Sequence, residues 1–260
     1  MVKKYVTLKD IAEEIDLAVT TVSKALRDHP DINIQTKKNV KKVAKEMGYI
    51  KNLSASSLKS NKSNTIGVIL SDNSNPFFQQ IMTGIEEEAQ KKNYKIIYMN
   101  SQGEEEKEKN AIKSLLEYRV DGLIIFPLQD IEEYKKYQIE KNSVLVSWTK
   151  GYKIIDSVSI KEREAFYLAT EHLIKNGREN ILFMDNFLYK TGYCIRRFEG
   201  YKDALNDYGI EFKEENHITR KDLDKSHRIN EGYFAMQEVL NQGKEFDGIV
   251  CFNDLMAYGV

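Results

Sequence analysis

Apolar residues recur at helical spacing in three stretches near the start of the chain. These stripes consist of Leu8, Ile11, Ala12 and Ile15, then Val22, Ala25 and Leu26, then Val40, Val43, Ala44 and Met47. Residues 16–18 interrupt the first two, so the pattern predicts two short helices joined by a tight turn. A third helix is expected over 34–47, with Asn33 as its cap.

From residue 65 onward, short apolar runs alternate with longer amphipathic segments. The apolar runs predict buried strands at 65–71, 94–99, 122–125, 144–146, 181–184 and 248–252. The amphipathic segments predict helices at 76–92, 104–119, 131–141, 161–176, 196–208 and 225–241. This alternation predicts an α/β fold with parallel sheets and helices on both faces.

The two parts of the chain differ in charge. Residues 1–62 contain 13 Lys and Arg against 7 Asp and Glu, a net charge of +6, whereas the whole chain carries −1. A basic head on an acidic body suits binding of phosphates by the head. With 260 residues and 41% hydrophobic content, the chain can bury a sizeable core in one or two domains.

Several classes of protein lack support in the sequence. No apolar run is long enough to span a bilayer, and no secretory signal follows Met1. Cys194 and Cys251 are too few for a disulfide framework, so a cytoplasmic protein with reduced thiols is expected. The four histidines lack metal-ligand spacing, and no phosphate loop or nucleophile elbow occurs. No catalytic residue, metal, cofactor or membrane partner is therefore expected, and the protein is not expected to be an enzyme.

The second helix carries short hydroxyls and a cation on its polar face. Thr20, Thr21, Ser23 and Lys24 would suit phosphate oxygens and base edges in a DNA major groove. A merely solvated face is an equally good interpretation of these residues alone. Thr7, followed by Asp10, can cap the first helix and place its N-terminus at a DNA phosphate.

Four segments near the start of the chain resemble the headpiece of the lactose-repressor (LacI/GalR) family. They are the runs Val6–Ala12, Thr21–Leu26 and Met47–Asn52 and the pair Thr36-Lys37. The resemblance implies a helix-turn-helix headpiece at 1–62 and a hinge helix at about 53–59, whose leucine is wedged into the minor groove. Without it, a disordered tether in which Leu58 is incidental is the lesser alternative for 53–59. The implied DNA-binding residues are Thr7, Val19, Thr20, Thr21, Ser23, Lys24, Arg27, Lys37, Ala55 and Leu58. One departure is Ala18, where the family commonly has a capping serine.

The rest of the chain, 63–260, resembles the family's periplasmic-binding-protein-like core. The resemblance implies an N-lobe at about 63–156 and a partial C-lobe at about 157–260, because the family continues with further strands and helices. The second lobe is thus expected to be incomplete, and weak dimerisation and weak effector binding are expected to follow.

Six residues are expected to bind an effector, because loops beyond the carboxyl ends of strands form the ligand sites of open α/β sheets. They are Asn75, Phe77, Phe78, Trp148, Arg197 and Asn253. Asn75, Phe77 and Phe78 match the family's Asn-Pro-Phe-Phe loop, and Asn253 matches its Asn-Asp ligand contact. Arg197 matches the family arginine that reaches into the cleft. Core packing is the rival interpretation for Phe77, Phe78 and Trp148.

The expected function is that of a sequence-specific DNA-binding transcriptional regulator, most naturally a repressor. Its partners would be a double-stranded operator, a second copy of the chain in a homodimer, and a sugar or sugar derivative bound between the lobes. The alternative is a solute-binding protein without a DNA function. The basic headpiece and the missing signal peptide are evidence against that alternative.

Overall fold

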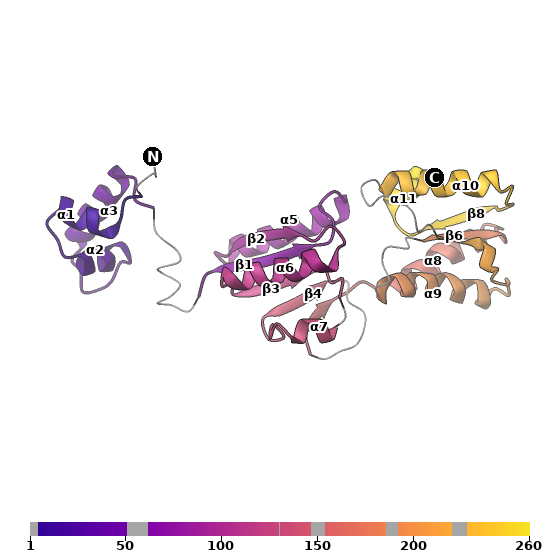
Figure 1. The fold of residues 1–260 in the computed structure, drawn as a ribbon, viewed down its shortest axis with the longest axis horizontal. Helices are drawn as coiled ribbons and strands as arrows, with labels where there is room; N and C mark the ends of the chain where they lie inside the picture. Colours follow the sequence, from indigo (N-terminus) through magenta and orange to yellow (C-terminus); the bar gives the residue numbers. More distant parts are fainter. Residues whose placement is uncertain (1–4, 51–61, 130, 147–153, 186–191, 220–227) are drawn as a thin grey trace. The chain divides into compact units, whose positions relative to one another are not determined.

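The computed structural model describes residues 5–50, 62–129, 131–146, 154–185, 192–219 and 228–260. The chain divides into two compact units, residues 1–63 and residues 64–260 (Figure 1). Ala55, Leu58 and Trp148, which the sequence singled out, lie outside the described residues. Within the described ranges, no helix is both long enough and apolar enough to cross a membrane.

Over residues 5–50, the first unit is a bundle of three helices, α1 (Leu8–Glu14), α2 (Val19–Leu26) and α3 (Ile34–Glu46). The apolar stripes of the sequence form its core, which consists of Ile11, Ala12, Val22, Ala25, Val40 and Ala44. The capping box at Thr7 is formed with Asp10, and the Asn33 side chain accepts a hydrogen bond from the Thr36 amide at 2.8 Å. The three predicted helices and both predicted caps are confirmed.

Helix α2 begins without a side-chain cap. Ala18 is its N-cap residue and offers no oxygen to the amides of the first turn. We expect Ala18→Ser to stabilise α2 by about 1 kcal/mol, the usual difference between serine and alanine at this position. Amide hydrogen exchange within α2 measures the change. Unchanged protection of the α2 amides would contradict the expectation, and α3, which already has its Asn33 cap, provides the internal control.

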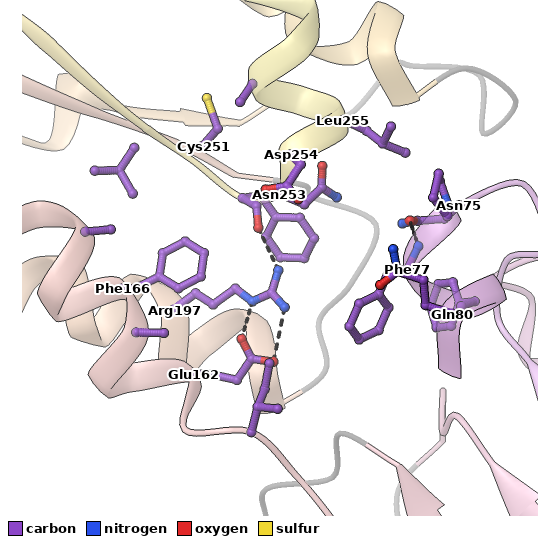
Figure 2. A pocket seen from close by; sticks show the side chains of 18 of the residues that line it. Asn75, Phe77, Gln80, Glu162, Phe166, Arg197, Cys251, Asn253, Asp254 and Leu255 are labelled. Atoms are coloured by element: carbon purple, nitrogen blue, oxygen red, sulfur yellow. Dashed lines mark hydrogen bonds and ion pairs between the residues drawn. The ribbon is translucent and has the colours of Figure 1, made fainter. Parts of the chain in front are cut away.

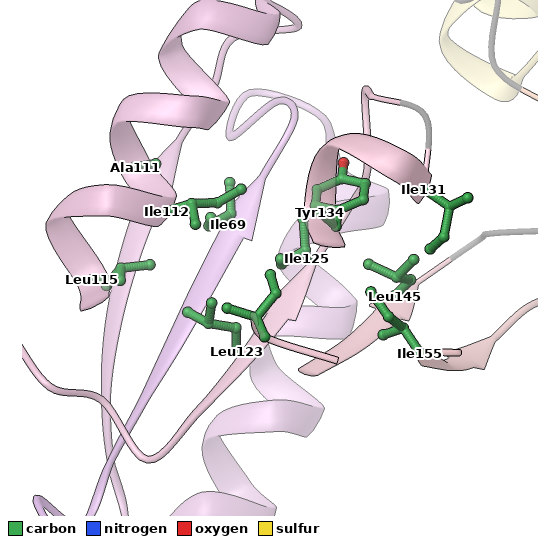
Figure 3. Packing of buried hydrophobic residues seen from close by; sticks show 11 residues of the cluster. Ile69, Ala111, Ile112, Leu115, Leu123, Ile125, Ile131, Tyr134, Leu145 and Ile155 are labelled. Atoms are coloured by element: carbon green, nitrogen blue, oxygen red, sulfur yellow. The ribbon is translucent and has the colours of Figure 1, made fainter. Parts of the chain in front are cut away.

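The second unit begins with a parallel sheet, whose described part has five strands in the order β2-β1-β3-β4-β5. Its strands are β1 (Thr65–Leu70), β2 (Lys95–Asn100), β3 (Gly122–Ile125), β4 (Ser143–Val146) and β5 (Asp156–Val158), and its helices are α5 (Pro76–Lys91), α6 (Glu105–Glu117) and α7 (Ile131–Lys135). Ile69 packs on one face of the sheet with Ile112 of α6 and Tyr134 of α7 (Figure 3). Val68 and Leu70 point to the opposite face and pack with Met82 of α5. The sheet therefore lies between two helical layers, as predicted.

Two features of this sheet differ from the sequence prediction. Helix α7 ends at Lys135 rather than continuing to residue 141, because the chain turns at Gln138 (φ 54°) and buries Ile139 in the core beneath it. Strand β5 was not predicted, because its three residues are all exposed and show no apolar pattern. Since β5 pairs with β4, the first sheet extends two residues beyond the expected lobe boundary at 156.

A second parallel sheet has the order β7-β6-β8 within the described residues. It contains β6 (Ile181–Asp185), β7 (His217–Thr219) and β8 (Gly248–Cys251), with helices α8 (Glu162–Lys175), α9 (Gly192–Asp207), α10 (Arg228–Asn241) and α11 (Asp254–Gly259) and a 3-10 turn at Glu214–Asn216. Phe183 packs with α8 and α9, whereas Leu182 and Met184 pack with α10 and α11 on the other face. These two helix pairs lie on opposite sides of the sheet (Figure 1). Strand β7 was not predicted, because three residues give no measurable alternation.

A buried carboxylate braces the loop that follows β3. Glu108 of α6 is fully buried and accepts hydrogen bonds from the Leu128 amide (2.9 Å), the Gln129 side-chain amide (2.6 Å) and the Tyr134 hydroxyl (2.7 Å). Loss of hydration raises the pKa of Glu108, and these hydrogen bonds oppose the rise only in part. This network connects α6 and α7 to residues 128–129.

The raised pKa of Glu108 predicts a pH-dependent contribution to stability. The folded carboxyl group retains its proton to a higher pH than the unfolded one, so its contribution is complete at low pH and is lost as the pH rises above the ordinary value of 4.5. We expect the unfolding free energy of wild type, measured relative to Glu108→Gln, to decrease over that range. Urea denaturation at a series of pH values tests this, and a constant difference between the two proteins would contradict it.

Candidate functional site

The residues that follow the carboxyl ends of the parallel strands form a candidate ligand site. In the first sheet the order reverses between β1 and β3, and in open α/β sheets ligands bind beyond the carboxyl ends of strands at such a point. Residues after β1 and β3 and residues after β8 together line a cavity of about 880 Å³. This volume falls within the usual range for small-molecule sites.

One wall of the cavity comes from the junction of β1 and α5. Asn75 is the N-cap of α5, and its Oδ1 accepts a hydrogen bond from the Phe77 amide at 3.0 Å. This cap fixes the side chain so that its NH₂ group is the group available to a ligand. Phe77 is 42% exposed, whereas Phe78 packs on Phe126 at a ring-centroid distance of 5.0 Å. Phe78 therefore belongs partly to the core, and Phe77 presents the more accessible aromatic face.

The opposite wall contains an ion pair that the sequence did not reveal (Figure 2). Arg197 of α9 donates to both carboxylate oxygens of Glu162 in α8, at 2.6 Å from Nε and 3.1 Å from Nη2. Its Nη1 donates to the Phe252 carbonyl oxygen at 2.6 Å, and its guanidinium lies 4.4 Å from the centre of the Phe252 ring. The side chain of Glu162 is only 2% exposed and that of Arg197 only 14%.

These contacts change the expectation for Arg197. The sequence suggested a fork available to ligand oxygens, but Glu162 and Phe252 already engage it. No local signal marks Glu162, because its partner lies 35 residues away in the chain. The first turn of α8 is a favourable place for a carboxylate, since it lies at the positive end of the helix dipole.

Asn253 repeats on this wall the arrangement of Asn75. It is the N-cap of α11, and its Oδ1 accepts a hydrogen bond from the Met256 amide at 2.9 Å. Its NH₂ group is thus oriented as a donor. Cys251 also lines the cavity, and burial raises the pKa of its thiol to about 11, so the thiol stays neutral near pH 7. Five of the six residues expected to bind an effector line this single cavity, namely Asn75, Phe77, Phe78, Arg197 and Asn253.

In the first unit, the polar face of α2 is accessible but internally paired. Val19 and Thr20 are exposed, and Thr21, Ser23 and Lys24 are half-buried. The ammonium group of Lys24 lies 3.2 Å from the Asp31 carboxylate. Arg27 donates to the Ser23 carbonyl and hydroxyl oxygens, both at 3.1 Å. The sequence did not reveal these contacts, and groups that bind DNA would have to exchange or share them.

Comparison with known proteins assigns both units. Residues 7–52 match the family of bacterial regulatory proteins, lacI family, and residues 63–260 match the periplasmic binding proteins and sugar binding domain of LacI family. The regulator RegA of Clostridium saccharobutylicum is 34% identical over 97% of this chain and 75% of its own length. Catabolite control protein A of Priestia megaterium is 30% identical over 98% and 76%, respectively.

Solved structures agree with this assignment. A LacI family transcriptional regulator from Silicibacter pomeroyi matches with a TM-score of 0.82 at 27% identity, over 98% of this chain and 75% of that one. The lac repressor dimer bound to operator and the anti-inducer ONPF matches with a TM-score of 0.82 at 25% identity, over 98% and 76%. In both structures, as in the curated relatives, this chain spans about three quarters of the matched protein.

A helix-turn-helix unit joined to a two-sheet unit with a ligand-sized cavity defines a DNA-binding transcriptional regulator that responds to a small molecule. The chain belongs to the LacI family of such regulators.

Proposed function

We propose that this regulator is a repressor whose effector is a neutral, sugar-like molecule bound in the cavity lined by Asn75, Arg197 and Asn253. The observation that carries the proposal is the pair of asparagine caps. Both hold Oδ1 in a helix cap, so both offer N–H donors that suit hydroxyl oxygens. The exposed face of Phe77 suits the apolar face of a sugar ring.

The DNA side of the proposal rests on α2 and on charge. Helix-turn-helix proteins place their second helix in the major groove, and here that helix bears Thr20, Thr21 and Lys24 on an accessible face. The remaining contact candidates are Thr7, Val19, Ser23, Arg27, Lys37, Ala55 and Leu58. We further propose a homodimer on a two-fold operator, in line with the dimeric state of the matched lac repressor.

A thermal-shift screen of neutral sugars and nucleobases tests the effector assignment. A true effector should raise the unfolding temperature of wild type and have much less effect on Asn253→Ala. The matched control is Asn206→Ala, because Asn206 is exposed on α9 and does not line the cavity. A ligand that stabilises wild type and Asn253→Ala equally binds elsewhere and would contradict the assignment.

We expect Lys24→Ala to weaken binding to a selected DNA duplex by about 1–3 kcal/mol if Lys24 contacts a guanine edge, with a base-dependent loss. Asp31→Asn should strengthen binding, because it releases Lys24 from its present partner. Fluorescence anisotropy at fixed salt concentration measures both variants. Lys42→Ala, which removes an exposed lysine from α3, is the control for loss of general positive charge. Equal effects of Lys24→Ala and Lys42→Ala on every sequence would contradict base recognition by Lys24.

A further inference from the structure

The cavity wall formed by α8, α9 and the end of β8 contains a cation whose charge is already matched. We infer that Glu162 is a specificity-determining residue: by holding the guanidinium of Arg197, it makes the cavity select neutral ligands and reject anionic ones. This inference rests on the proposed function, because it concerns the ligand of the same cavity. Glu162 does not need to contact the effector for this role.

The geometry of the pair supports the inference. An arginine binds a phosphate or carboxylate best through two parallel N–H donors, and Nε and Nη2 form such an edge. In this protein the two oxygens of Glu162 occupy that edge, at 2.6 Å and 3.1 Å. The Phe252 carbonyl engages Nη1, and the rings of Phe166 and Phe252 lie 5.2 Å and 4.4 Å from the guanidinium carbon. The aromatic contacts and the three hydrogen bonds hold the arginine in one orientation (Figure 2).

The charged residues around the cavity also favour a neutral ligand over an anion. The described lining residues include one permanent cation, Arg197, one histidine, His172, and two acids, Glu162 and Asp254. An anion entering this site would meet a matched ion pair and a second carboxylate. To bind Arg197 it would have to displace Glu162, which would leave a carboxylate that is only 2% exposed next to another negative charge. A neutral hydroxyl group carries no such cost and can still bind the asparagine amides.

Inorganic phosphate is a suitable probe, because it tests the charge of the wall without knowledge of the effector. We expect isothermal titration calorimetry to detect no binding of millimolar phosphate to wild type. Glu162→Gln keeps the side-chain size and removes the charge, so it should gain phosphate affinity of about tenfold or more over wild type. In the double variant Glu162→Gln with Arg197→Gln, the gain should disappear, which places the bound phosphate at Arg197.

The matched control is Glu164→Gln. Glu164 lies two residues further along α8, pairs with Lys161 and has a side chain that is 57% exposed, and it does not line the cavity. This variant should behave as wild type does. If Glu162→Gln does not fold, Glu162→Asp decides the question, because its side chain is one methylene shorter and holds the carboxylate too far from Arg197 for both hydrogen bonds. It should then gain part of the phosphate affinity.

Two results would overturn the inference: phosphate binding by wild type that is lost in Arg197→Gln, or no gain in any folded Glu162 variant. The role of Glu162 and the proposed function can fail independently of each other. If no neutral compound stabilises the protein but Glu162→Gln gains phosphate binding at Arg197, the effector proposal fails and the role of Glu162 stands. If an effector binds through Asn253 but no Glu162 variant gains phosphate binding, only the role of Glu162 fails.

Discussion

Arg197→Ala is expected to lower the free energy of unfolding of the 64–260 unit by about 3–5 kcal/mol, the usual cost of removing one partner of a buried ion pair. The reason is that Glu162, 2% exposed, would lose both hydrogen bonds from Arg197 and remain charged or take up a proton. Effector binding and folding are therefore expected to fall together. Urea denaturation followed by circular dichroism measures the loss.

An exposed ion pair between the same two helices provides the control for Arg197→Ala. Arg163 pairs with Asp203 at 2.5 Å, but their side chains are 54% and 37% exposed. Arg163→Ala should therefore cost no more than about 1 kcal/mol. Replacing Arg197 and Glu162 together by Met and Leu should recover much of the lost stability, because no buried charge then remains. A loss of under about 1 kcal/mol in Arg197→Ala would contradict the geometry of the pair.

Gly200→Ala is expected to destabilise the same unit by about 3 kcal/mol, the upper end of the usual range for overpacking. A Cβ atom at Gly200 would lie 2.1 Å from the Arg163 carbonyl oxygen and 2.9 Å from the Tyr167 amide nitrogen, so α8 and α9 would have to separate. This separation would also loosen the Glu162–Arg197 pair, which joins the same helices. Ligand affinity should therefore decrease together with stability.

The same substitution at Gly84 should act in the opposite direction. Gly84 lies inside α5, and a Cβ atom added there would meet no neighbouring atom within 4 Å, so alanine adds no clash. Its better helix propensity should stabilise the protein by about 1 kcal/mol. The unfolding temperatures of Gly84→Ala and Gly200→Ala, measured together, distinguish the effect of helix propensity from the effect of overpacking. Destabilisation by Gly84→Ala would contradict the open space beside α5, and stabilisation by Gly200→Ala would contradict the close contact between α8 and α9.

The parts of the fold that the sequence predicted are those governed by local rules. Apolar periodicity located the three headpiece helices and most strands and helices of the second unit, and cap residues such as Thr7 and Asn33 marked helix starts. The junctions at Asn75 and Asn253 could be found because each lies where a strand ends and a helix begins. Periodicity could not find β5 and β7, since each has only three residues.

Local sequence patterns could not predict which side chains pair with each other. Glu162 and Arg197 meet only because α8 and α9 pack closely, and Lys24 meets Asp31 only because the chain turns after α2. Five residues that line the cavity could therefore be named from the sequence, but not their partners. These partners decide whether a cation is available to a ligand or to DNA.

We expect a neutral ligand in the cavity of the 64–260 unit to control the DNA affinity of the 1–63 unit. The most direct test measures the affinity of the protein for a duplex selected from random DNA by fluorescence anisotropy, with and without a saturating neutral ligand from the thermal-shift screen. The affinity should change by about fivefold or more in wild type and change little in Asn253→Ala at the same ligand concentration. A ligand that saturates the cavity and leaves the DNA affinity of wild type unchanged would contradict it.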